Sequence, residues 1–274
     1  MTVSPSAKRA EFRRLHESGC FVLPNPWDAG GVRVLERLGA KALASTSAGF
    51  AWSIGKPDGA VTLEEMLAHL TALAAMTELP VNADFEHGYA DAPDAVAKNV
   101  TRAVATGVAG LSIEDSTGRP DRPLYDFAHA VERVKAARAA IDAGGTGTLL
   151  TARSEGFFVG RPDLDETVKR LKAFAEAGAD CLYAPGLPDH AAIGAALKAV
   201  APKPVNVLAA GPGFKVAELA ALGVRRVSVG GALARAAWGG FISAARDMLD
   251  GGAFQPFQPI APFRNLNAAF KDAT

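Results

Sequence analysis

Residues 80–115 read PVNADFEHGYADAPDAVAKNVTRAVATGVAGLSIED, and this stretch predicts the fold. PVNADF (80–85) and GLSIED (110–115) are short, mostly apolar runs typical of buried strands, and residues 92–106 carry a helical pattern between them. A glycine in ATGVAG is placed where the helix must end in a left-handed turn. A strand, a helix and a second strand of this length predict two neighbouring parallel strands.

The same unit recurs along the whole chain. Strands are predicted at 20–25, 41–47, 80–85, 110–115, 147–153, 181–186, 204–210 and 225–231, and helices at 29–38, 63–77, 92–106, 125–142, 163–177, 190–200, 215–222 and 233–250. Eight such units predict a closed (β/α)8 TIM barrel of parallel strands. An open doubly wound sheet would need G-x-G-x-x-G after its first strand, and LPNPWDAGG does not supply it.

Composition limits the class of protein. The chain has 274 residues, 49% of them hydrophobic, and 29 basic residues balance 29 acidic ones, so neither nucleic acid nor an anionic membrane is an expected partner. Cys20 and Cys181 have no metal-type spacing and are interpreted as core thiols of a reducing compartment. No segment resembles a signal peptide or a membrane span, so a cytoplasmic location is expected.

Two regions are expected within the chain. Residues 1–250 form the barrel domain, and residues 251–274 form a tail that mixes Pro, Phe and Gln and ends in a possible short helix. Aromatic residues left in water are unfavourable. The tail is therefore expected to pack on the barrel or on a partner subunit, which favours a homo-oligomer.

Acidic side chains end two adjacent predicted strands. Asp84 and Glu86 close the third strand, and Glu114 and Asp115 close the fourth. Carboxylates gathered at one rim repel each other unless a cation lies between them, and a hard divalent ion such as Mg²⁺ prefers oxygen ligands. Such an ion bound through Asp84 and Glu114, largely by way of water, would chelate the carbonyl and carboxylate of a 2-oxo acid.

Other polar residues are expected at the same rim. Arg153 ends the fifth strand, where it would grip a substrate carboxylate or form an ion pair with Glu114 or Asp115. Ser45, Thr46 and Ser47 offer hydroxyl and N–H donors to an oxyanion, although turn chemistry also explains them. Asn206 lies at the end of the seventh strand and is expected to contact the substrate as well.

The sequence also bears on two other kinds of chemistry. No predicted strand ends in lysine, which argues against a Schiff-base aldolase. The segments AAGPGFK and SVGGALA resemble a glycine-rich phosphate cradle, so an unrelated isomerase that binds phosphate at Gly213 and Gly231 is an alternative; a plain turn and close helix packing explain the same glycines.

Taken together, these residues resemble the isocitrate lyase/phosphoenolpyruvate mutase superfamily over residues 20–250. The matching segments are STSAGFAWSIGKPDG, PVNADFEHGYA, GLSIEDS, LLTARSEG, EAGADCLYAPGL and GVRRVSVGG. The resemblance implies a Mg²⁺ (or Mn²⁺) site at Asp84 and Glu114, substrate contacts from Ser45, Thr46, Ser47 and Arg153, a supporting Asp58, and tetramers that exchange their last helix. It also implies that Asn82 replaces a second metal-shell aspartate, a loss that Glu86 would offset.

The chain departs from the resemblance after the fourth strand. The lyases carry a Lys-Lys-Cys-Gly-His type loop there, whereas this chain reads STGRPDRPLYDF (116–127), with Arg119 and Arg122 as its only cations. Cleavage of isocitrate or methylisocitrate needs an acid for the departing carbanion, and the usual acid is absent from this chain. Decarboxylation or a related C–C cleavage of a small 2-oxo or 2-hydroxy di- or tricarboxylate is therefore the leading prediction. P–C bond chemistry on phosphoenolpyruvate-like substrates, and a barrel that binds a 2-oxo acid without turnover, are the alternatives.

Overall fold

The eight parallel strands form one barrel-shaped sheet in the order β1-β8-β7-β6-β5-β4-β3-β2. The computed structural model describes residues 3–211, 213–254 and 261–271. The strands are β1 Phe21–Leu23, β2 Leu43–Ala44, β3 Val81–Asp84, β4 Gly110–Glu114, β5 Leu149–Arg153, β6 Cys181–Tyr183, β7 Val205–Leu208 and β8 Arg226–Ser228. The predicted TIM barrel is confirmed, and each strand is shorter than predicted at one or both ends.

A side-chain amide completes the barrel between its two end strands. The Ala44 N–H donates to the Pro24 carbonyl at 3.0 Å. Asn25 donates from Nδ2 to the Ser45 carbonyl at 2.9 Å, and its Oδ1 accepts the N–H groups of Val229 and Gly230 at 3.0 Å each. One residue thus joins the ends of β1, β2 and β8.

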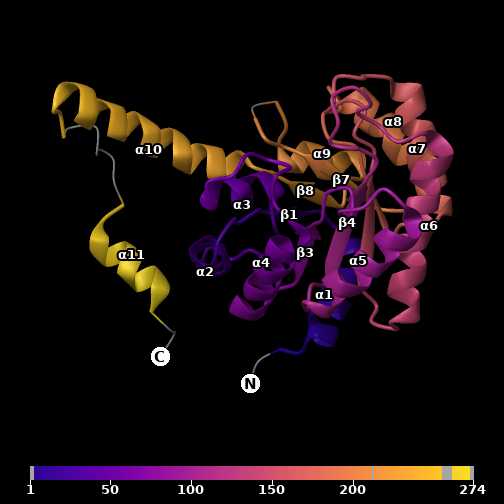
Figure 1. The fold of residues 1–274 in the computed structure, drawn as a ribbon, viewed down its shortest axis with the longest axis horizontal. Coiled ribbons are helices and arrows are strands. Elements are labelled where there is room, and N and C mark those ends of the chain that lie inside the picture. Colours follow the sequence, from indigo (N-terminus) through magenta and orange to yellow (C-terminus); the bar gives the residue numbers. More distant parts are fainter. Residues whose placement is uncertain (1–2, 212, 255–260, 272–274) are drawn as a thin grey trace.

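Helices cover the barrel from outside (Figure 1). In the described part of the chain they are α1 Pro5–Glu17, α2 Ala29–Arg37, α3 Ser47–Ser53, α4 Leu63–Met76, α5 Pro93–Ala105, α6 Phe127–Ala143, α7 Leu164–Glu176, α8 His190–Val200, α9 Val216–Leu222, α10 Ala232–Gly251 and α11 Phe263–Phe270. The predicted helices omitted α1 and α3. Buried Phe12 of α1 packs with Phe21, Leu23 and Leu149, so α1 closes the N-terminal end of the barrel.

Local sequence explains where several helices begin and end. Thr62 and Glu65 form a capping box at the start of α4, and Asp163 accepts the Glu166 N–H at the start of α7. Gly223 ends α9 in the left-handed conformation at φ 101°, which glycine adopts without a Cβ penalty.

The C-terminal part of the chain leaves the barrel as an arm. Figure 1 shows α10 extending away from the barrel and α11 lying back toward α2. Arg37 of α2 donates to the Ala268 carbonyl of α11 at 2.9 Å, so part of the predicted tail does pack on the barrel. Exchange of this tail between subunits, and the division at residue 250, stay predictions.

Candidate active site

Arg153 is the centre of a group of carboxylates at the C-terminal rim of the barrel. It lies opposite Glu114 in the β4–β5 register, so both side chains face the barrel interior. Its Nη1 lies 2.6 Å from Asp84 Oδ1 and 3.3 Å from Glu114 Oε2, and its Nε lies 2.9 Å from Glu155 Oε1. One guanidinium therefore contacts three carboxylates, and the predicted ion pair with Glu114 is present.

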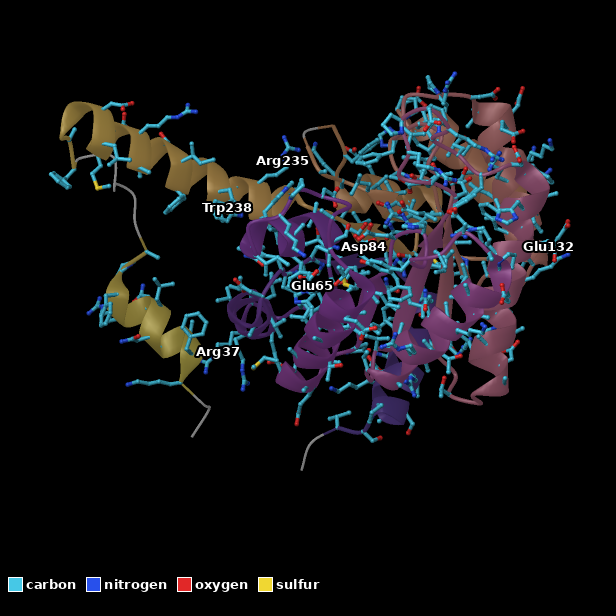
Figure 2. The ribbon with its side chains drawn as sticks, in the orientation of Figure 1. Arg37, Glu65, Asp84, Glu132, Arg235 and Trp238 are labelled. Carbon is cyan, nitrogen blue, oxygen red and sulfur yellow. The ribbon has the colours of Figure 1, made fainter. Side chains whose placement is uncertain are left out.

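Asp84, which Figure 2 labels within the barrel, is held by the chain that leads into α3. Its Oδ2 accepts both the N–H and the hydroxyl of Ser47 at 3.0 Å, and its own N–H donates to Ser45 Oγ at 2.8 Å. Thr46 caps α3 by accepting the Gly49 N–H at 3.2 Å. The Ser-Thr-Ser triplet thus orients Asp84 and starts a helix, and Ser45 and Thr46 are fully enclosed.

Glu86 lies beyond the end of β3 in a strained loop. Glu86 has φ 48° and Tyr89 has φ 57°, a region that residues other than glycine enter at a cost of roughly 1–3 kcal/mol each. The Tyr89 hydroxyl donates to Glu86 Oε1 at 2.7 Å. Burial, with a further contribution from Asp84, raises the pKa of Glu86 to about 7. Such strain is typical of residues that a binding site holds in one position.

Buried Arg133 of α6 holds the same loop from behind. Its guanidinium donates to the carbonyls of His87, Ala90 and Asp91, and its Cζ lies 4.0 Å from the centroid of the Tyr125 ring. Tyr125 in turn donates to the Asp91 carboxylate. The backbone around Glu86 is therefore fixed by its own network of hydrogen bonds.

The site carries more negative than positive charge. Burial raises the pKa of Glu114 well above its ordinary value, Arg153 opposes this rise, and Glu155 adds to it. Burial followed by Asp84 also raises the pKa of Asp58, which the Gly59 N–H and Arg153 partly offset. A single guanidinium does not neutralise these groups, so the rim favours an additional cation.

These residues fit a hard divalent ion that keeps part of its water shell. Asp84, Glu86 and Glu114 offer only oxygen donors, which suits Mg²⁺ or Mn²⁺. In the described part of the chain, no three His, Cys, Asp or Glu side chains converge closely enough to enclose an ion directly. Binding through one or two carboxylates and water is the usual mode for Mg²⁺. Metal binding therefore stays a prediction that the donor chemistry supports.

Several residues predicted from the sequence lie elsewhere. Asp115 points away from the rim, where its carboxylate accepts the Glu155 N–H at 2.7 Å and pairs with Arg170 at 3.1 Å. Asn82 lies one layer below Asp84, and its buried Oδ1 has no hydrogen-bond partner among the described residues. Asn206 is also below the rim, with its amide engaged by Arg226 and Ser228.

The loop after β4 is closed on itself. Thr117 N–H donates to the Pro123 carbonyl at 3.0 Å, and Ser116 bridges Leu124. Its two arginines are already paired, Arg119 with Asp91 at 3.1 Å and Arg122 with Asp126. Both guanidinium groups are therefore engaged by carboxylates rather than available to a transferring phosphoryl group.

Tyr183 was not predicted as a site residue. It ends β6 opposite Arg153 in the β5–β6 register, and Arg153 Cζ lies 5.1 Å from the centroid of its ring. The strand CLY (181–183) contains a signal that could have identified it, because alternation places Cys181 and Tyr183 on the same inward face.

The fold and the site together define a class of protein: a (β/α)8-barrel enzyme with an arginine among carboxylates at the C-terminal ends of its strands. The family model for phosphoenolpyruvate phosphomutase matches residues 12–249. The chain belongs to this family, within the isocitrate lyase/phosphoenolpyruvate mutase superfamily. No described helix is both long and apolar enough to cross a membrane.

Relatives agree with this assignment. An uncharacterized protein of Mycobacterium tuberculosis is 33% identical over 263 residues, covering 95% of this chain and 96% of its own. Oxaloacetate decarboxylase of Paraburkholderia xenovorans is 30% identical over 83% of this chain and 76% of its own.

Solved structures show the same similarity. A provisionally assigned lyase/mutase of Burkholderia cenocepacia superposes with a TM-score of 0.93 at 48% identity, covering 97% of this chain and 96% of its own. Oxaloacetate acetylhydrolase bound to its product oxalate superposes with a TM-score of 0.85 at 27% identity, covering 97% of this chain and 94% of its own. A 2,3-dimethylmalate lyase superposes with a TM-score of 0.83 at 26% identity, covering 98% of this chain and 95% of its own.

Proposed function

We propose that this protein is a Mg²⁺-dependent (or Mn²⁺-dependent) carbon–carbon lyase that acts on small 2-oxo or 2-hydroxy di- or tricarboxylic acids, with decarboxylation or a related cleavage as its reaction. The observation that carries the proposal is the contact of Arg153 with Asp84, Glu114 and Glu155 at one rim of the barrel. The names of the relatives support the substrate class, since two of them act on oxaloacetate and one on 2,3-dimethylmalate.

The carboxylates and the arginine of the site would have different roles. Asp84 and Glu114, with Glu86 nearby, would hold the ion, which when bound acts as a Lewis acid toward the keto acid. Arg153 would bind a substrate carboxylate through its planar fork, at the expense of one of its present carboxylate contacts. Ser47 orients Asp84 through its two hydrogen bonds.

The test is a substrate panel. Purified protein with Mg²⁺ is incubated with oxaloacetate, dimethylmalate, isocitrate and methylisocitrate, and release of pyruvate, oxalate, glyoxylate or CO₂ is followed, with EDTA and Glu114→Gln as controls. We expect product from at least one acid, abolished by both controls. If every acid remained intact while the folded protein still bound it, a non-catalytic acid-binding barrel would be the better description.

A second candidate, P–C bond chemistry on phosphoenolpyruvate-like substrates, is favoured by the family model, which is that of a phosphomutase. The pairing of Arg119 and Arg122 with Asp91 and Asp126 argues against it, because phosphoryl transfer needs cations around the moving group. Phosphorus NMR of phosphoenolpyruvate and phosphonopyruvate incubated with the enzyme distinguishes the two candidates.

A further inference from the structure

A buried ion pair behind the candidate site ties the end of β4 to α7. Asp115 Oδ2 and Arg170 Nη1 lie 3.1 Å apart, and the two side chains are 1% and 8% exposed. The same Nη1 donates to the Tyr125 carbonyl at 3.0 Å, and the Tyr125 N–H donates to the Asp115 carbonyl at 2.9 Å. Arg170 Nε donates to Glu166 Oε1 at 2.9 Å. Further hydrogen bonds therefore hold both partners of this pair in place.

The other oxygen of Asp115 holds the turn that follows Arg153. Asp115 Oδ1 accepts the Glu155 N–H at 2.7 Å. The Glu155 side chain, which is 3% exposed, reaches back to Arg153, where its Oε1 accepts from Nε at 2.9 Å. Each hydrogen bond on the path from Arg170 to Arg153 has an N–H group as donor and a carboxylate oxygen as acceptor, so its direction is unambiguous.

The contact with Glu155 leaves one end of the Arg153 guanidinium open. Glu155 engages Nε, and Asp84 and Glu114 share Nη1, whereas Nη2 has no hydrogen-bond partner among the described residues. Nη2 is also not one of the described buried side-chain atoms that lack a partner, so it retains contact with solvent. Nη1 and Nη2 form the edge that a carboxylate would approach with two oxygens. Because Glu155 is not one of the proposed ion ligands, its contact with Nε is the one that neither an ion nor an acid would displace.

We infer that Glu155 sets the direction of the Arg153 guanidinium toward the bound acid, and that Asp115 and Arg170 act as positioning residues that hold Glu155. The inference rests on the proposed function, because it takes the ligand of Arg153 to be a small carboxylic acid. A binding group that is held in its binding direction loses less freedom when the ligand arrives, which strengthens binding. Asp115, which lies behind the rim, thus acts on the ligand through Glu155 and Arg153.

The first test separates position from charge. Glu155→Gln removes the charge and keeps an acceptor for Arg153 Nε, whereas Glu155→Ala removes both. Loss of a negative charge near the site by itself favours a dianion, so we expect Glu155→Gln to bind oxalate at least as tightly as the unaltered protein. We expect Glu155→Ala to bind oxalate roughly 10-fold more weakly, because the guanidinium is no longer held. Calorimetry of the full chain at saturating Mg²⁺ measures these affinities, and Glu132→Ala, the same change on the exposed face of α6, is the control.

The second test asks whether Asp115 acts through Glu155. Asp115→Asn keeps only one of the two oxygens that serve Glu155 and Arg170, and it also removes a negative charge. We expect it to weaken oxalate binding roughly 10-fold in the otherwise unaltered chain and to cause no further loss in Glu155→Ala, because both changes release the same guanidinium. Thermal melting shows which variants are folded. Arg170→Lys, which keeps a cation beside Asp115 with fewer donors, takes the place of Asp115→Asn if that variant does not fold.

The possible results separate this inference from the proposed function. Oxalate affinity of Glu155→Ala equal to that of Glu155→Gln overturns the role of Glu155. Equal losses from Asp115→Asn with and without the Glu155 side chain overturn the role of Asp115 and Arg170, since they indicate an effect that does not pass through Glu155. Both results leave the proposed function in place. An unaltered protein that neither binds oxalate nor cleaves any acid overturns the proposed function, and this inference with it.

Discussion

At the scale of single residues, Arg153 balances charges that the barrel would otherwise leave buried and unpaired. It contacts Asp84, Glu114 and Glu155 with a side chain that is 13% exposed. The sequence predicted its place from the end of an apolar run, but the number of its carboxylate partners depends on how the ends of β3, β4 and β5 come together.

Replacing this guanidinium therefore affects stability as well as binding. We expect Arg153→Met to lower the free energy of unfolding by about 3–5 kcal/mol at pH 8, because it leaves buried carboxylates without a partner. The loss is expected to be smaller at pH 5, where those carboxylates take up protons. Urea unfolding at both pH values checks this, with Arg153→Lys, which keeps the charge, as control. An equal loss at both pH values would contradict the electrostatic explanation.

Glu86 predicts a pH dependence of the metal-free protein. Burial raises its pKa from 4.5 to about 7 in the folded state. The folded protein therefore binds more protons than the unfolded chain between these values, so the free energy of unfolding falls as pH rises from 4.5 to 7, by about 3 kcal/mol from this group.

Glu86→Gln removes this titrating group while keeping an oxygen for the Tyr89 hydroxyl. We expect a flatter decline of stability between pH 4.5 and 7, and weaker stabilisation by Mg²⁺ at pH 8. Thermal melting across pH, with and without Mg²⁺, measures both effects. An unchanged pH profile would show that Glu86 is not the titrating group.

At the scale of elements, α3 connects the Ser-Thr-Ser triplet to the position of Asp84. The sequence indicated a turn there, since SAGFAWS is too short for its helical period to be evident. Only the folded chain shows that Gly49 lies against neighbours: a Cβ on it would come within 2.7 Å of Thr46 Cγ2 and 2.9 Å of Trp27 Cβ.

We expect Gly49→Ala to displace the start of α3 and to lower the free energy of unfolding by roughly 1–3 kcal/mol. Because Ser47 moves with α3, its two hydrogen bonds to Asp84 should weaken, and Mg²⁺ affinity should fall as well. Gly239→Ala, at a helical glycine with open space around its Cβ, is the matched control. Equal effects of the two substitutions on Mg²⁺ affinity would exclude this coupling.

At the scale of the whole molecule, the arm exposes apolar side chains to solvent. Phe241 and Leu249 on α10 are 64% and 78% exposed, and Phe263 on α11 is 80% exposed. Figure 2 shows Trp238 on the same arm, far from Asp84. Apolar surface of this kind is typical of an interaction site, which supports the predicted homo-oligomer.

Light scattering after size exclusion tests this prediction. We expect the unaltered chain to elute as a dimer or tetramer and Phe241→Glu to shift it toward smaller species, because a buried charge without a partner opposes association. Lys271→Glu, a charge change on the surface beyond α11, is the control for charge alone. A monomeric unaltered chain would mean that the arm has another partner.

The sequence by itself determined the barrel, since apolar strands alternating with capped helices bury their surface best in a closed parallel sheet. It also determined that Asp84, Glu114 and Arg153 share one rim, because every parallel strand ends on the same side. Tertiary structure alone decided that Asp115 turns outward to Arg170, that Asn206 serves Arg226 and that Tyr183 lies beside Arg153. Strand periodicity gives the face of a side chain, whereas its partner depends on residues distant in sequence that packing brings into contact.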